Sequence, residues 1–181
     1  LIDFEKVGTL ESFNTDGLRS ILFTMSHIPD MKEKTLRYPG HIDLMKALVK
    51  AGFLDHTAID CNGSSIRPID FTSAILFDKW KLQEAEEEFT IMKIVITGTK
   101  EGKPLQVEYF LYDEYDHATN ASSMSRTTGY TCTAAVNLIG QKIFTTKGVF
   151  PPELVGKEAG CFEYIIKYLK ERNVNYSYQE S

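Results

Sequence analysis

Two apolar stretches in the middle of the chain, residues 89–97 and 105–112, constrain its fold more than any other feature. In the first, F-T-I-M-K-I-V-I-T, apolar residues occupy both alternating sets of positions, which is typical of a central strand covered on both faces. The second alternates, with one apolar face formed by Leu105, Val107, Tyr109 and Leu111. Glycine and proline occur between the two stretches, so the sequence predicts an antiparallel hairpin.

Apolar residues at helical spacing predict helices on both sides of this hairpin. The longest expected helix has many small side chains. The expected helices cover residues 42–50, 68–80, 121–140 and 162–169. Short strands are expected at residues 1–4, 9–13, 33–37, 142–146 and 174–178. Because this order is not a repeated βαβ unit, we expect an α+β fold with a mixed, mainly antiparallel sheet covered by helices.

One more helix is expected to begin near Asn14 or Thr15, since either side chain can cap free amides at a helix start. Asp16 would then lie in the positive first turn. The apolar stripe of this helix would consist of Leu18, Ile21, Leu22 and Met25.

The composition narrows the class of protein. With 43% hydrophobic and 25% charged residues, the 181-residue chain is typical of a globular domain. A formal net charge of −5 without dense basic runs argues against nucleic acid and anionic membranes as partners. No secretory signal pattern and no membrane-spanning apolar run is present. Three widely spaced cysteines, an odd number, indicate a reducing cytoplasmic compartment.

Neither a metal site nor a dinucleotide site is predicted in this chain. The acidic cluster Glu84, Glu86, Glu87 and Glu88 has no histidine partners and is expected to be a solvated edge. No G-x-G-x-x-G segment occurs, and residues 98–103, G-T-K-E-G-K, are better explained as a hairpin turn than as a phosphate loop.

Arg37 ends an expected strand, and Pro39 and Gly40 then turn the chain into a helix whose entry carries His41. A guanidinium at a strand end can bind a carboxylate through two parallel hydrogen bonds. The simpler alternative is a surface arginine paired with a neighbouring acid. His41 has the same two alternatives: a hydrogen-bond or proton donor to a ligand, or an exposed residue at the helix start.

Five segments are notable for their order and spacing. In chain order they read T-L-E-S-F-N-T-D-G-L-R-S-I-L from Thr9, K-T-L-R-Y-P-G-H from Lys34, G-F-L from Gly52, M-S-R-T-T-G-Y-T from Met124 and K-G-V-F-P-P-E from Lys147. Together they resemble the C-terminal domain of the saccharopine dehydrogenase family, which includes saccharopine reductases and dehydrogenases and related lysine dehydrogenases. No single segment is decisive, but their order and spacing are specific, and they span nearly the whole chain.

The resemblance implies one substrate-binding and dimerisation domain over residues 1–181, with a fold like the glyceraldehyde-3-phosphate-dehydrogenase C-terminal domain. It also implies an N-terminal Rossmann domain outside this chain, which residues 121–181 would contact. NAD or NADP would bind to that domain, so the isolated chain is expected to be inactive. The native protein is expected to be a homodimer.

The implied activity is the NAD(P)-dependent oxidation of an amino acid at a C–N bond in lysine metabolism, with saccharopine, lysine or a similar compound as substrate. In that reading Arg37 binds a substrate carboxylate, while Asn14, Thr15, Asp16 and His41 supply hydrogen bonds and one negative charge.

Arg126 is expected to face the substrate or the cofactor domain, or else to form a surface salt bridge. The sequence does not assign a catalytic acid or base. A non-catalytic amino-acid-binding module or a dimerisation module is the alternative function.

Overall fold

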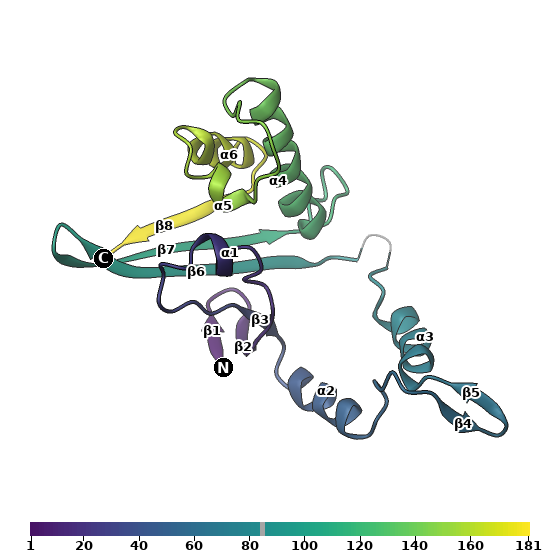
Figure 1. Cartoon of the computed structure of the whole chain (residues 1–181). Helices are drawn as coiled ribbons and strands as arrows, with labels where there is room; N and C mark the ends of the chain where they lie inside the picture. Colours follow the sequence, from purple (N-terminus) through teal and green to yellow (C-terminus); the bar gives the residue numbers. More distant parts are fainter. Residues whose placement is uncertain (84–85) are drawn as a thin grey trace. The chain divides into compact units, whose positions relative to one another are not determined.

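The computed structural model describes residues 1–83 and 86–181. The chain divides into two compact units, Leu1–Leu82 and Gln83–Ser181 (Figure 1). Unit 1 and unit 2, as we call them, are described separately below. Both contain helices and small antiparallel sheets, which confirms the α+β class.

Unit 1 begins with a three-stranded antiparallel sheet in the order β1-β2-β3. Its strands are β1 (Ile2–Phe4), β2 (Gly8–Asn14) and β3 (Lys34–Arg37). A second sheet consists of β4 (Ile59–Cys61) and β5 (Ser64–Ile66). Asn62 and Gly63 join these two strands with φ of 54° and 81°, as a tight hairpin turn of the primed type requires.

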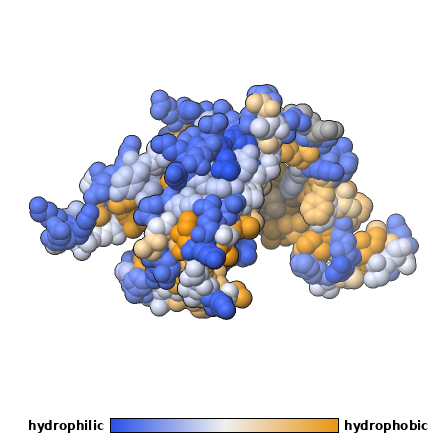
Figure 2. Space-filling view, turned by 90° about the horizontal axis from the view of Figure 1, so that it is seen from above, coloured by the Kyte–Doolittle hydropathy of each residue, from blue (hydrophilic) through white to orange (hydrophobic). Residues whose placement is uncertain are grey.

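The helices of unit 1 are α1 (Ile21–Thr24), α2 (His41–Lys50) and α3 (Pro68–Trp80). The last two confirm the helical spacing of the sequence, with Pro68 at the first helical position of α3. Apolar atoms reach the surface where α3 and the β4–β5 hairpin lie, at the right of Figure 2. Helix α2 has no fully buried residue, and α3 buries only Thr72.

The helix expected from Asn14 or Thr15 was predicted wrongly. Asn14 is the last residue of β2, the next residues form a turn, and α1 is a single turn that begins at Ile21. The reason lies in a distant residue: the carboxylate of Glu33 accepts hydrogen bonds from the Thr15 hydroxyl and, at 3.1 Å, from the Gly17 amide. These contacts hold the segment in a turn against the start of β3.

Unit 2 contains the predicted hairpin, formed by β6 (Phe89–Lys100) and β7 (Lys103–Glu114), and a third strand, β8 (Tyr176–Glu180). Glu101 and Gly102 form the turn, with φ of 53° and 77°. The order β6-β7-β8 makes β6 an edge strand, so the prediction that it is central was wrong. Its apolar residues on both faces had suggested a covered strand, but Val95 and Ile96 are exposed.

Helices α4 (Ser123–Gly140), α5 (Pro152–Val155) and α6 (Cys161–Lys170) lie on one side of this sheet (Figure 1). Two small apolar clusters fill the space between these elements. One contains Leu111, Leu169 and Val174, and the other contains Leu138, Phe144 and Cys161. Residues 121–181 thus pack against β6 and β7 within unit 2.

The strand expected at residues 142–146 is not formed. Lys142 has φ of 59°, and the amide of Ile143 donates to the carbonyl of Leu138, so the chain reverses at the end of α4. Phe144 is buried, which explains why the segment is apolar without being a strand. Among the described residues, no helix is both long and apolar enough to cross a bilayer.

Candidate functional site

The residues proposed to bind substrate in unit 1 lie on or near the paired strands β2 and β3. In this pair Glu11 lies opposite Arg37, and Phe13 lies opposite Thr35. Because opposite residues and residues two apart share one side of a sheet, these four side chains project from the same face. We call it the Arg37 face.

Arg37 is exposed, and its Nη1 donates to the carbonyl of Leu36 at 2.7 Å. It forms no salt bridge with any described carboxylate. The nearest acid across the strands, Glu11, is engaged elsewhere: its Oε1 accepts from the backbone amide of Ile42 at 2.6 Å, in the first turn of α2. A carboxylate is stabilised at that position by the free amides and the positive end of the helix dipole.

His41 lies on the Arg37 face as well. It is the first residue of α2, and its ring stacks on that of Phe13 with centroids 6.1 Å apart and an interplanar angle of 19°. The sharp change from strand to helix depends on Gly40, whose φ of 101° is disfavoured for residues with a Cβ atom. The Tyr38-Pro39-Gly40 turn therefore brings His41 to the same side as Arg37.

Thr15 is the third predicted residue on this face. Its hydroxyl oxygen lies 2.9 Å from that of Thr35 and donates to Glu33. Asn14 is different: it follows Phe13 directly in β2 and therefore points to the opposite side of the sheet. Asp16 is exposed in the turn beyond the strand. The structure thus places Arg37, His41 and Thr15 on one face, with Arg37 and Thr15 at opposite ends of the β2–β3 pair, and places Asn14 on the other face.

The sequence prediction missed four residues of this face: Glu11, Phe13, Thr35 and Glu33. The alternation of residues 9–13 held the signal for the first two, because a strand there places Glu11 and Phe13 on one side. Nothing local marked Glu33, which meets Thr15 only through the pairing of β2 with β3.

Arg126 belongs to unit 2 and is 7% exposed. Its Nη1 donates to the carbonyl of Glu114 at 3.1 Å and its Nη2 to that of Arg172 at 3.2 Å. The same Nη2 lies 3.4 Å from Asp113 Oδ1. The expected surface salt bridge is therefore wrong, because the pair is buried. A contact between Arg126 and a substrate remains a prediction, and most of its nitrogen atoms are already engaged.

The described residues of the acidic cluster contact three different parts of unit 2, and Glu84 lies outside the described residues. Glu86 accepts from the Gln83 amide at 2.8 Å, Glu87 lies 3.4 Å from His117, and Glu88 accepts from the Met124 amide at 3.4 Å. In the described part of the chain, no three histidine, cysteine or acidic side chains are grouped as a metal site would require.

One carboxylate beyond the acidic cluster has a shifted pKa. The Thr119 hydroxyl, and then the Ala118 amide, hold the pKa of Asp116 below its usual value by donating hydrogen bonds to it. These contacts close the loop before α4. The acidic residue Asp116, just after β7, therefore has a structural role in this turn.

Among the residues that the structure describes, the turn before α2 does not fit a dinucleotide. A pyrophosphate needs free amides at a glycine-rich strand-to-helix turn. The β3–α2 turn has a glycine, but the Ile42 amide in the first turn of α2 binds the Glu11 carboxylate, whose negative charge would repel a pyrophosphate.

A comparison with known protein families agrees with the sequence motifs. Residues 1–174 match the family described as saccharopine dehydrogenase C-terminal domain, so the match covers all but the last seven of the 181 residues. The matched range contains the Arg37 face and the buried Arg126. The chain belongs to the saccharopine dehydrogenase family and carries its C-terminal domain.

Proposed function

We propose that this chain is the substrate-binding part of an NAD(P)-dependent amino-acid oxidoreductase of the saccharopine or lysine dehydrogenase type, active in lysine metabolism. The family is one of oxidoreductases that are generally NAD(P)-dependent. Since the described residues offer no fitting dinucleotide site, we place the cofactor in a domain outside this chain. NAD(P), when bound there, supplies the hydride chemistry, and the residues of this chain bind and orient the amino acid.

The observation that carries the proposal is the state of Arg37. Its guanidinium is exposed and free of carboxylate partners among the described residues, although Glu11 lies directly across the strands. Helix α2 holds Glu11 through the Ile42 amide. An incoming carboxylate therefore meets an arginine that has no carboxylate partner, so no ion pair has to break first, and only the bond from Nη1 to the Leu36 carbonyl competes for the guanidinium.

Other residues of unit 1 suit the rest of an amino acid. His41 and Thr15 offer hydrogen bonds from the Arg37 face, and Asp16, exposed in the turn after β2, offers the negative charge that an ammonium group prefers. Lysine and saccharopine both carry at least one carboxylate and one amino group. Arg37 would bind the carboxylate and so fix the position of the reacting carbon.

Two further properties belong to the proposal. A homodimer would form through the sheet side opposite α4 and α6, where Phe89 stacks on Tyr112 and Lys93 pairs with Glu108 at 2.9 Å. A cytoplasmic location suits the three cysteines, which are all free thiols.

The test is Arg37→Lys in the full-length protein that contains the cofactor domain. Lysine keeps the charge but loses the two parallel hydrogen bonds, so substrate binding should weaken by about 1.5–3 kcal/mol, roughly 10- to 100-fold in KM. Arg67→Lys is the matched control, because Arg67 lies in the same unit and is already paired with Asp70 at 2.7 Å. Equal KM and kcat in the Arg37→Lys and parent enzymes would contradict the proposal.

Two further measurements, beginning with calorimetry on the isolated chain, distinguish the proposed function from the non-catalytic alternative. We expect no tight binding of NAD or NADP and no turnover. Tight binding of either nucleotide would show that the cofactor site lies in this chain. Amino-acid binding by a full-length protein without any dehydrogenase activity would favour the non-catalytic module instead.

A further inference from the structure

Four buried polar atoms in unit 2 have no hydrogen-bond partner among the described residues: Thr90 Oγ1, Asp113 Oδ2, Ser123 Oγ and Arg126 Nε. Ser123 is 0% exposed, and Asp113 and Arg126 are also buried. Folded proteins satisfy nearly all such groups, with protein or with ordered water, because an unpaired buried polar atom has lost its solvation without compensation.

The residues that carry the four atoms lie at one junction, where the start of α4 meets the sheet. Thr90 and Asp113 lie directly opposite each other on β6 and β7. Ser123 and Arg126 lie one turn apart at the start of α4, and Arg126 Nη2 reaches Asp113 at 3.4 Å.

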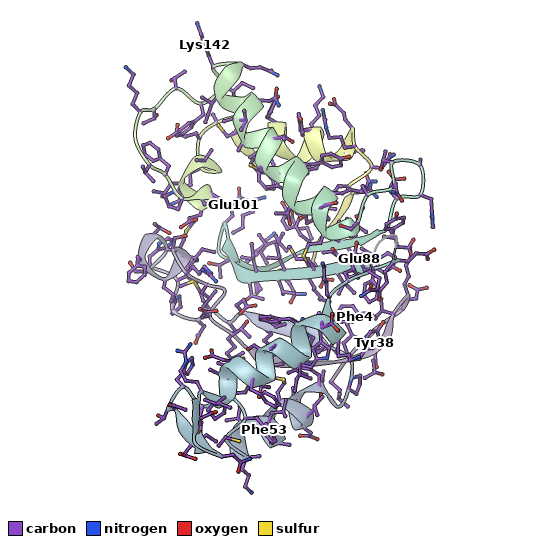
Figure 3. All side chains as sticks on the ribbon, turned by 90° about the vertical axis from the view of Figure 1, so that its right-hand side faces the viewer. Phe4, Tyr38, Phe53, Glu88, Glu101 and Lys142 are labelled. Carbon is purple, nitrogen blue, oxygen red and sulfur yellow. The ribbon has the colours of Figure 1, made fainter. Side chains whose placement is uncertain are left out.

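The neighbouring residue Glu88 marks the same junction. Glu88 precedes Thr90 by two residues, and its carboxylate accepts a hydrogen bond from the Met124 amide of α4. Figure 3 shows Glu88 near the end of α4 that approaches the sheet, whereas Lys142, just beyond the other end, lies far from it.

The chemistry of the four atoms selects the ligand. The charges of Asp113 and Arg126 compensate each other, so neither an anion nor a cation is required. Asp113 Oδ2 needs a donor, Arg126 Nε needs an acceptor, and the two hydroxyls can act as either. A small neutral molecule that both donates and accepts satisfies all four, and water is that molecule.

We propose that ordered water is a permanent part of this junction and bridges α4 to the β6–β7 hairpin through these four atoms. A buried water makes about three hydrogen bonds, so one or two molecules suffice. The bridge adds to the direct ion pair and attaches both ends of that pair to the Thr90 and Ser123 hydroxyls.

The sign of a stability change tests the proposal. Thr90→Val removes the hydroxyl at nearly constant shape. If water bridges that hydroxyl, the unfolding equilibrium constant should rise by about five- to tenfold relative to the control Thr97→Val. Thr97 lies on the same strand and is exposed, so this control corrects for the strand preference of valine. If the hydroxyl is unsatisfied, its removal should stabilise the protein, and that result would overturn the proposal.

Two measurements complete the test on the full chain. The double variant Thr90→Val/Ser123→Ala should show non-additive effects, since both hydroxyls share the same water. A high-resolution crystal structure should show an ordered water within hydrogen-bond distance of at least two of the four atoms. A bound ion at this position, or four atoms paired directly with protein groups, would contradict the proposal.

Discussion

Units 1 and 2 differ in how they bury their side chains. In unit 2 the side chains of Leu111, Leu138 and Val174 are at most 1% exposed. Among the described residues of unit 1, Phe4, Leu10 and Thr72 are the only buried ones, and Phe23 and Phe77 are 82% and 72% exposed. Unit 2 therefore has a hydrophobic core of its own, whereas in unit 1 helix α2 buries no residue and α3 buries only Thr72.

The ion pairs show the same contrast. Arg67 and Asp70 of unit 1 pair at 2.7 Å with side chains more than half exposed, whereas Arg126 and Asp113 of unit 2 pair in the interior. The same kind of ion pair therefore differs in electrostatic energy between the two units, because solvent screens the exposed Arg67–Asp70 pair but not the buried Arg126–Asp113 pair. The residues of the Arg37 face therefore lie in the less tightly packed unit, where functional side chains remain accessible.

The largest expected difference appears when the chain is divided. Residues 83–181 expressed alone should unfold in one cooperative transition, because both apolar clusters lie within this segment. Residues 1–82 alone should show no cooperative transition when their unfolding in urea is monitored by circular dichroism. Cooperative unfolding of the shorter fragment would mean that the difference in burial does not govern stability.

Arg126→Met should destabilise the protein by about 3–5 kcal/mol, because it leaves Asp113 buried and uncompensated. Arg67→Met, in the exposed pair of unit 1, should change the free energy of unfolding by less than about 1 kcal/mol. Urea denaturation of both variants measures the difference. Similar losses in the free energy of unfolding for both variants would show that burial does not make the Arg126–Asp113 pair more important than the Arg67–Asp70 pair.

Leu111→Ala should destabilise the protein by about 2–5 kcal/mol, since it leaves a cavity between β7, α6 and the segment before β8. The same substitution at Leu44, which is 52% exposed on α2, should have less than about 1 kcal/mol of effect. Thermal denaturation gives both values, and a large loss at Leu44 would show that α2 is covered in solution.

Helix caps provide a smaller test. Ser122 accepts from the Ser125 amide at 3.1 Å, so Ser122→Ala should destabilise the protein by about 1 kcal/mol. Ser20 precedes α1 but makes no side-chain cap, and Ser20→Ala should be close to neutral. Equal losses in urea denaturation would argue against the cap at Ser122.

The smallest effect is expected from pH. Burial raises the pKa of the Cys161 thiol above its ordinary value. The stability that the protonated thiol contributes is complete below the ordinary thiol pKa, about 8.5, and is lost as the pH rises through the folded-state value. Cys161→Ala should reduce this alkaline loss. Iodoacetamide should label the exposed Cys61 and Cys132 in the native chain before Cys161.

Features that depend on neighbouring residues were predictable from the sequence. The alternation of residues 105–112 and their turn led correctly to β6 and β7, and the apolar stripes led to α2, α3, α4 and α6. Strand pairing across a tight turn and helix periodicity arise within one segment, so the amino-acid pattern alone carries them. The family was also predictable from the sequence, because each of its motifs is a contiguous segment of the chain.

Tertiary structure decided whatever depends on residues far apart in the chain. Glu33 replaced the expected helix start at Thr15 with a turn, and helix α2 withdrew Glu11 from Arg37 through the Ile42 amide. The pairing of β2 with β3 placed Asn14 on the wrong face for the site. Burial of Arg126 likewise required α4 to pack on β7. A hydrogen bond between residues 18 or 31 positions apart leaves no local pattern in the sequence, because it exists only once the strands and helices have met.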